Sequence, residues 1–180
     1  MATPPVFSAG AVLTAAQMNA VGLWLVKTQT VGTGVSSVPV SDAFTSDFEN
    51  YRIFYTGGTG SAAGVGLRFQ LGSSTTNYYN TVNYSLYSGG GVTSVTNNNS
   101  LGYWQYAGSS DSNARAFMCI DVYEPNEAVS TRFNGSWCQV DSAGTTAGIH
   151  RANTAYTAFT ITPDSGTLTG GTIRIYGYRD

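Results

Sequence analysis

Few residues of this 180-residue chain could carry out acid–base or nucleophilic chemistry. His150 is the only histidine, so a serine or cysteine nucleophile would have a single candidate base. Its neighbours, in the sequence Gly148-Ile-His-Arg-Ala, match no nucleophile motif, and the Gly-x-Ser-x-Gly sequence of hydrolases does not occur. We therefore expect His150 to be a loop residue without a catalytic role.

The carboxylates offer a second kind of chemistry. A glycosidase needs two carboxylates that face each other across a cleft, and a calcium site needs clustered oxygen ligands. Most of the carboxylates stand beside turn residues, and the segments Asp111-Ser-Asn113 and Asp141-Ser142 lack the density of a calcium-binding loop. We expect no catalytic site, no metal and no cofactor. The carboxylates are Asp42, Asp47, Glu49, Asp111, Asp121, Glu124, Glu127, Asp141, Asp164 and Asp180.

Two glycine-rich segments and two cysteines also have simple interpretations. The segments at 57–60 and 89–91 are followed by no Gly-Lys-Ser/Thr sequence and no helix, so we expect hairpin turns or flexible loop tips rather than phosphate-binding loops. Cys119 and Cys138 lie in expected strands, and a hairpin around residues 124–130 would bring them near each other. A disulfide requires the α-carbons to approach within about 7 Å. We expect two reduced, partly buried thiols, with a disulfide as the alternative.

Aromatic residues gather in the middle third of the chain, close to Asn97-Asn98-Asn99. Exposed aromatic faces beside amide groups are typical of surfaces that bind sugars, so glycan contact is one interpretation. The other is ordinary strand packing, in which the ring is buried and the hydroxyl reaches water. The candidate glycan contacts are Tyr78, Tyr79, Tyr103 and Trp104, and the wider cluster includes Tyr84, Tyr87 and Tyr106.

The charge content argues against two classes of partner. The net charge is −2, only 10% of the residues are charged against about 25% in typical domains, and Lys27 is the only lysine. A duplex nucleic-acid binder needs a basic stripe, and electrostatic membrane attachment needs basic clusters. No segment approaches the roughly 18–20 apolar residues of a membrane span, and the N-terminus lacks the features of a signal peptide. We expect no nucleic acid, no membrane insertion and synthesis in a cytoplasm.

Short apolar-alternating segments separated by Gly, Asn and Ser turns must position any site. This pattern predicts an all-β fold, an antiparallel two-sheet sandwich of jelly-roll type over residues 28–180. No strand alternates with a helix, which disfavours a parallel α/β sheet. The expected strands lie at 23–31, 36–40, 51–56, 67–71, 78–87, 101–106, 115–123, 131–140, 155–162 and 172–178.

Residues 1–27 predict an N-terminal arm with one short helix. Thr14 and Gln17 fit a capping box, and Gly22 is placed to end the helix. A helix of about two turns is marginal in water unless it docks, and Leu13, Met18 and Val21 supply an apolar face. This face packs either on the chain's own body or on another protein.

The segment Val6–Gly22 and the closing phrase Gly170–Tyr178 resemble parts of virion structural proteins of tailed bacteriophages. The resemblance implies a non-enzymatic particle component, located in the virion, whose arm anchors it to a capsid or tail protein. Partner contact then falls on Phe7, Leu13, Met18 and Val21. The resemblance also implies outward display of the sandwich and a homo-oligomer, with a trimer favoured.

Capsid decoration, minor tail and fibre proteins all fit this resemblance, so head and tail locations both stay open. Two other functions also stay open. One is a receptor-recognition module that binds a host surface glycan through the aromatic cluster. The other is an enzyme that cleaves such a glycan.

Overall fold

The computed structural model describes Gly10 and residues 22–178, and these residues form an all-β, antiparallel structure without a helix. The expected helix and the residues Phe7, Leu13, Met18 and Val21 lie outside the described residues. The strands are β1 (Trp24–Thr30), β2 (Val38–Val40), β3 (Asn50–Thr56), β4 (Thr59–Gly60), β5 (Val65–Leu71), β6 (Tyr78–Leu86), β7 (Thr93–Asn98), β8 (Trp104–Ser110), β9 (Phe117–Tyr123), β10 (Thr131–Cys138), β11 (Ser142–His150), β12 (Phe159–Pro163), β13 (Leu168–Thr169) and β14 (Thr172–Tyr178).

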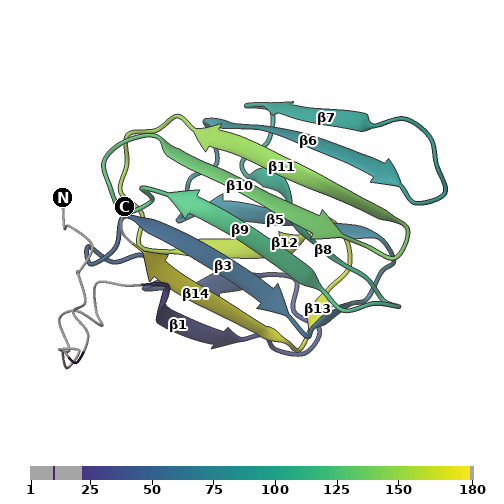
Figure 1. Cartoon of the computed structure of the whole chain (residues 1–180), viewed down its shortest axis with the longest axis horizontal. Helices are drawn as coiled ribbons and strands as arrows, with labels where there is room; N and C mark the ends of the chain where they lie inside the picture. The colour runs from purple at the N-terminus through teal and green to yellow at the C-terminus, as the bar shows by residue number, and fades with distance from the viewer. Residues whose placement is uncertain (1–9, 11–21, 179–180) are drawn as a thin grey trace.

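Twelve of these strands share one hydrogen-bonded sheet that folds back over itself, and β4 pairs with β13 separately. The front part has the order β1-β14-β3-β9-β10-β11-β6-β7, and the rear part has the order β2-β12-β5-β8. In Figure 1, β5, β8 and β12 lie behind β3, β9 and β10. The two parts are joined through β8 and β9 only at Gly108↔Met118 and Ser109↔Phe117.

A bulge in β8 makes this fold-back possible. Trp104 pairs with Phe69, whereas Gly108 pairs with Leu67, so β8 has extra residues between these two pairs. A side chain at Gly108 would place its Cβ 2.6 Å from the Met118 Cβ, so only glycine fits where β8 crosses to β9. Beyond the bulge, Gly108 and Ser109 pair with β5 on one side and with β9 on the other, so the end of β8 links the rear part of the sheet to the front part.

The core lies between the two parts of the sheet. In β9 the alternation expected from the sequence is confirmed, because Met118, Ile120 and Val122 are all buried. From β8, Trp104 stacks on Phe133 with ring centroids 4.2 Å apart, so an aromatic layer crosses the gap. Each such fully buried large side chain contributes roughly 1.5–3 kcal/mol.

Most strands expected from the sequence are confirmed, with several differences. Strand β8 starts at Trp104 and runs beyond the expected end at Tyr106, β12 starts at Phe159 rather than at residue 155, and β4, β7, β11 and β13 were not expected. At the other end, β1 begins at Trp24, which pairs with Gly177. The expected boundary between arm and body, after residue 27, therefore falls inside β1. The expected hairpin turn at 89–91 is confirmed, since it joins the paired strands β6 and β7, with positive φ at Gly89 and Gly90. The segment at 57–60 is not a hairpin turn, because Thr59 and Gly60 form β4, which pairs with β13 and not with β3.

Candidate functional site

A pocket of about 470 Å³ lies at the end of the molecule where β6 and β10 end. Figure 1 shows the β6–β7 and β10–β11 connections at this end, on the right, and the start of β1 and the end of β14 at the left. The volume falls within the range of about 300–1,000 Å³ that is usual for ligand pockets. We call it the distal pocket; it is lined by Ala63, Gly64, Tyr84, Leu86, Tyr106, Asp111, Asn113, Trp137, Gln139, Val140, Asp141 and Ser142.

Three aromatic rings from three strands form one wall of the distal pocket. The Trp137 ring centroid lies 5.3 Å from that of Tyr106 and 5.9 Å from that of Tyr84. Trp137 pairs with Gly144 across the β10–β11 ladder. A Cβ on Gly144 would come within 2.8 Å of the Trp137 Cζ2, so the glycine makes room for the indole. Tyr84 and Tyr106 are half-buried and Trp137 is buried.

The backbone at Tyr106 is strained in a way that orients its ring. Tyr106 has a φ of 54°, in the left-handed region, and it lies in the β8 bulge. A non-glycine residue in this region costs of order 1–3 kcal/mol, and such strain concentrates at functional sites. Burial raises the pKa of Tyr106, and the nearby Asp164 and Tyr84 raise it further. The phenol therefore stays neutral and keeps its hydroxyl as a donor at physiological pH.

Polar groups face the aromatic wall from the loops. Both carboxylate oxygens of Asp111 accept backbone N–H groups, from Gly64 at 2.8 Å and from Asn113 at 2.6 Å, which ties two loops together. The Gln139 side-chain oxygen accepts the Ser142 hydroxyl at 3.3 Å, but its buried Nε2 has no hydrogen-bond partner. The buried Nε1 of Trp137 also lacks a partner. Among the described residues that line this pocket, none is a lysine or an arginine.

A second, shallow hollow of about 540 Å³ crosses the outer face of the front part of the sheet. Arg52 and Asp121 lie on its wall and form two hydrogen bonds with each other, at 2.7 and 2.8 Å. Arg52 and Asp121 are the charged residues of the hollow's described lining, and each is already paired with the other. Burial raises the pKa of the Cys119 thiol in the same hollow, Asp121 raises it further and Arg52 lowers it, so the thiol is not an activated nucleophile. No aromatic side chain lines the described part of this hollow.

The expectation of glycan contact is wrong at Tyr78 and Trp104, since both side chains are fully buried. They face the gap between the two parts of the sheet, where their rings meet edge to face with centroids 5.5 Å apart. The Tyr78 hydroxyl accepts the backbone N–H of Leu71 at 2.8 Å. Neither ring presents a surface to a ligand.

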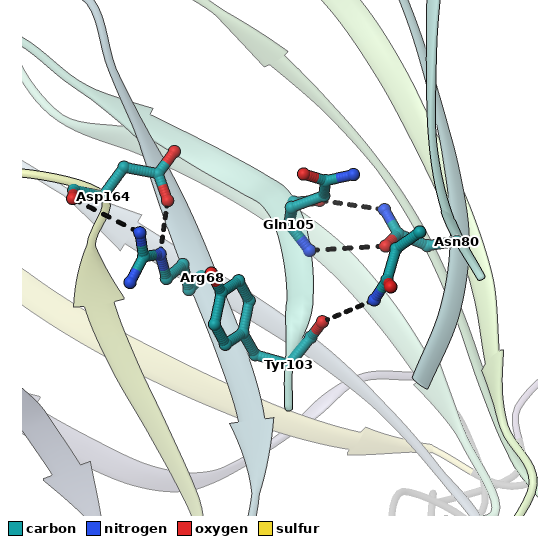
Figure 2. A network of polar contacts seen from close by, with 6 residues as sticks. Arg68, Asn80, Tyr103, Gln105 and Asp164 are labelled. Carbon is teal, nitrogen blue, oxygen red and sulfur yellow. Dashed lines mark hydrogen bonds and ion pairs between the residues drawn. The ribbon is translucent and has the colours of Figure 1, made fainter. Parts of the chain in front are cut away.

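Tyr79 and Tyr103 are half-buried, and each lies beneath an arginine. The Arg151 guanidinium lies 4.1 Å from the Tyr79 ring centroid, and that of Arg68 lies 4.6 Å from the Tyr103 centroid. Figure 2 shows Arg68 beside the Tyr103 ring and bonded to Asp164. These arginines cover faces that a sugar would need, so glycan contact at Tyr79 and Tyr103 stays a prediction.

The close-up in Figure 2 also shows how the free edge of β8 is satisfied. The Asn80 side chain on β6 donates to the Gln105 carbonyl at 3.1 Å and accepts the Gln105 N–H at 3.5 Å. The Asn97 side chain on β7 donates to the Tyr103 carbonyl at 3.1 Å. Amide side chains thus replace a neighbouring strand, which holds β8 in place next to the distal pocket.

The expected location of His150 in a loop is wrong. It is the last residue of β11 and is fully buried, with its ring centroid 4.4 Å from that of Tyr78. Its Nε2 lies 2.9 Å from the Ser74 hydroxyl, but its Nδ1 has no hydrogen-bond partner to orient it as a base. Burial lowers the pKa of His150 and outweighs a backbone hydrogen bond that raises it. Neither of the two hollows described above is lined by Ser74 or His150.

Both cysteines are free, as expected. The β9–β10 hairpin places Cys119 opposite Ser136, so Cys138 is not its direct partner. Cys119 is partly buried, but the expectation of partial burial is wrong for Cys138, which is exposed at the end of β10. Within the described part of the chain, no group of three or more His, Cys, Asp and Glu side chains could hold a metal ion.

The described residues contain no helix long and apolar enough to cross a membrane. Comparisons of the chain with protein-family models, with curated proteins and with solved structures find no match. Of the two hollows described, the distal pocket is the stronger candidate site because it has an aromatic wall, and its candidate residues are Tyr84, Tyr106, Trp137 and Gln139. Tyr84 and Tyr106 belong to the aromatic cluster noted in the sequence, but nothing in the sequence connects them to Trp137.

Proposed function

We propose that this protein is a non-enzymatic structural component of a tailed-bacteriophage particle. In this proposal it is displayed on the exterior as a jelly-roll-like β-sandwich and attached through its N-terminal arm to a capsid or tail protein. It acts as a capsid decoration or cement protein, or as a tail or fibre component. The single observation that carries the proposal is that the N-terminal residues enter the body at one end of the molecule and the distal pocket lies at the opposite end.

That arrangement separates attachment from display. The N-terminal residues lead into β1 at Trp24, at the end of the molecule opposite the distal pocket (Figure 1). Leu23 and Leu25 are 46% and 57% exposed, so the apolar character of the arm continues onto the body. An arm that binds a particle would therefore leave the pocket facing outward.

The sheet supports the sandwich part of the proposal. Its front and rear parts share only two directly paired positions between β8 and β9, so they behave as two layers around one core. A two-layer all-β fold with few charges suits an exposed component that must stay folded outside the cell. A homo-oligomer, with a trimer favoured, belongs to the same proposal.

The attachment proposal can be tested with a chain that lacks residues 1–22. This variant keeps β1 and should retain the circular dichroism spectrum and unfolding midpoint of the full chain. It should no longer co-purify with particles in immunoblots, because the apolar arm is missing. Val92→Asp is a matched control, since Val92 is 74% exposed and precedes β7 at the distal end. Normal incorporation of the shortened chain would overturn the proposal.

A second candidate function is receptor recognition through a glycan. The four aromatic residues expected from the sequence do not support it equally, because two of them are buried in the core. The observation that favours it is the aromatic wall of the distal pocket. That site belongs to the same exposed end that the attachment proposal directs outward.

A further inference from the structure

We infer that the distal pocket binds a neutral saccharide. In this inference Tyr84 and Tyr106 supply the stacking surface, Trp137 supports it from behind, and Gln139 donates a hydrogen bond to a sugar hydroxyl. The inference deepens the receptor-recognition candidate by naming its site and ligand class. It does not require the chain to belong to a particle.

The aromatic wall matches the apolar side of a sugar ring. A pyranose presents C–H groups on its ring faces and hydroxyls around its rim, so it needs a flat apolar surface and polar groups at the edge. The Trp137 ring is inclined by 30° to the Tyr106 ring and by 45° to the Tyr84 ring, so Trp137 joins the two tyrosines into one continuous apolar wall. Tyrosine rings also bring hydroxyls to the rim of such a surface.

Polar groups with unused bonding capacity lie around this wall. Gln139 Nε2 is buried without an acceptor, which costs about 1–3 kcal/mol unless an acceptor is provided. The Asp141 side chain accepts only the Ser142 hydroxyl, at 2.9 Å, and keeps further acceptor capacity. A sugar hydroxyl donates and accepts, so it can satisfy an amide N–H and a carboxylate together.

The charge of the pocket selects among saccharides. Asp111 and Asp141 line it, and no lysine or arginine is present among its described lining residues. A sialylated, sulfated or phosphorylated sugar would bring a negative charge to carboxylates without a compensating cation. The electrostatics therefore favour a neutral saccharide over an anionic one.

The test uses the purified full-length chain on an array of neutral, sialylated and sulfated glycans. Titration calorimetry follows with the best neutral oligosaccharide. Tyr84→Ala removes part of the stacking surface, and Gln139→Glu replaces the donor with an acceptor of equal size. Each change should weaken binding by about tenfold or more, since tenfold corresponds to roughly 1.4 kcal/mol.

Two matched controls separate the pocket from the rest of the surface. Tyr176→Ala removes a half-buried tyrosine from β14, and Gln29→Glu makes the same amide-to-acid change on β1; neither strand lines the pocket. Both should leave the affinity unchanged within about twofold, as expected of substitutions remote from a site. Circular dichroism confirms that each variant is folded.

Three results would overturn the inference. They are the absence of neutral glycan binding, a preference for anionic glycans, and affinity that survives Tyr84→Ala and Gln139→Glu. The chain without residues 1–22 distinguishes this failure from failure of the attachment proposal. That variant should bind the same neutral glycan as the full chain even though it no longer joins particles.

Discussion

The two tryptophans in β8 and β10 show how similar rings serve different parts of the molecule. Trp104 stacks on Phe133 in the core, with centroids 4.2 Å apart, and Trp137 lies against Tyr106 at the distal pocket. Both indole Nε1 atoms are buried without a hydrogen-bond partner. An unpaired indole donor therefore does not by itself identify a ligand site. The difference lies in the surroundings, since only Trp137 adjoins a pocket with an unpaired amide and free carboxylate capacity.

Both regions are built on one pair of strands. Phe133 and Trp137 lie on the inner face of β10, opposite Gly148 and Gly144 of β11. At Phe133 the rear part of the sheet closes over the ring through Trp104. At Trp137 the covering ring is Tyr106 of the β8 bulge, which is itself half-buried and lines the distal pocket. The same strand pair thus borders a sealed core at Phe133 and an open pocket at Trp137.

Truncation of an aromatic ring in each region should give the largest contrast. Trp104→Ala removes a fully buried side chain and should destabilise the protein by about 3–5 kcal/mol. Tyr84→Ala removes a half-buried ring that faces the pocket and should cost about 1 kcal/mol. Denaturant unfolding followed by circular dichroism measures both changes. Equal losses would mean that the two regions are packed alike.

The paired glycines of β11 give a sharper version of the same contrast. A Cβ at Gly148 would lie 2.4 Å from the Tyr79 carbonyl and 2.7 Å from the Phe133 ring, in the closed region. Gly148→Ala should therefore cost about 1–3 kcal/mol through overpacking. A Cβ at Gly144 meets a matching backbone contact, 2.5 Å from the Asn83 carbonyl oxygen, so the two costs differ only through the rings. Gly144→Ala should cost less and alter tryptophan fluorescence, because the Trp137 ring can shift towards the pocket whereas Phe133 is enclosed in the core. A larger loss at Gly144 in the same unfolding assay would contradict this assignment.

These glycines also explain why β9 could be predicted from the sequence whereas β11 could not. Alternation identified β9, where every inner side chain is apolar in its own right. Strand β11 was missed because its inner positions include Gly144 and Gly148, and the rings that cover them belong to β10. The apolar side chains that cover the inner face of β11 thus belong to β10, so β11 itself shows no apolar alternation.

The candidate site was only partly predictable for a related reason. Tyr84 and Tyr106 belong to an aromatic cluster visible in the sequence, but Trp137 joins them only through the pairing of β6, β10 and β11. The left-handed backbone of Tyr106 depends on the β8 bulge. Alternation places side chains on one face of a strand and does not identify which distant strand covers that face. For this reason the sequence leaves Tyr78 and Trp104 open between glycan contact and strand packing.

In the core, the free energy of unfolding should depend on pH through His150, whose ring centroid lies 6.4 Å from that of Trp104. Burial lowers the folded-state pKa of His150 below its usual value of about 6.5. The unfolded chain therefore binds the proton first on acidification, so stability is retained above about pH 6.5 and lost as the pH falls towards the folded pKa. His150→Gln removes this effect.

Unfolding free energies of the wild type and His150→Gln, measured from pH 7.5 to pH 5, check this prediction. The other titrating groups are common to both proteins, so the difference between the two curves isolates the histidine. The advantage of the wild type should shrink as the pH falls. A constant difference across this range would mean that His150 is as accessible to protons as in the unfolded chain.

The smallest effect is expected where the pocket itself is changed least. Trp137→Phe keeps an aromatic ring opposite Gly144 but removes the unpaired Nε1 donor. Removing a buried donor that has no partner loses no hydrogen bond. The lost ring volume borders a pocket rather than a sealed core. Trp137→Phe should therefore lower the free energy of unfolding by about 1 kcal/mol or less. Trp104→Phe in the core should cost more, because the smaller ring leaves a cavity there. Denaturant unfolding of the two variants ranks them, and a loss at Trp137 as large as that at Trp104 would mean that the distal ring is held as tightly as the core.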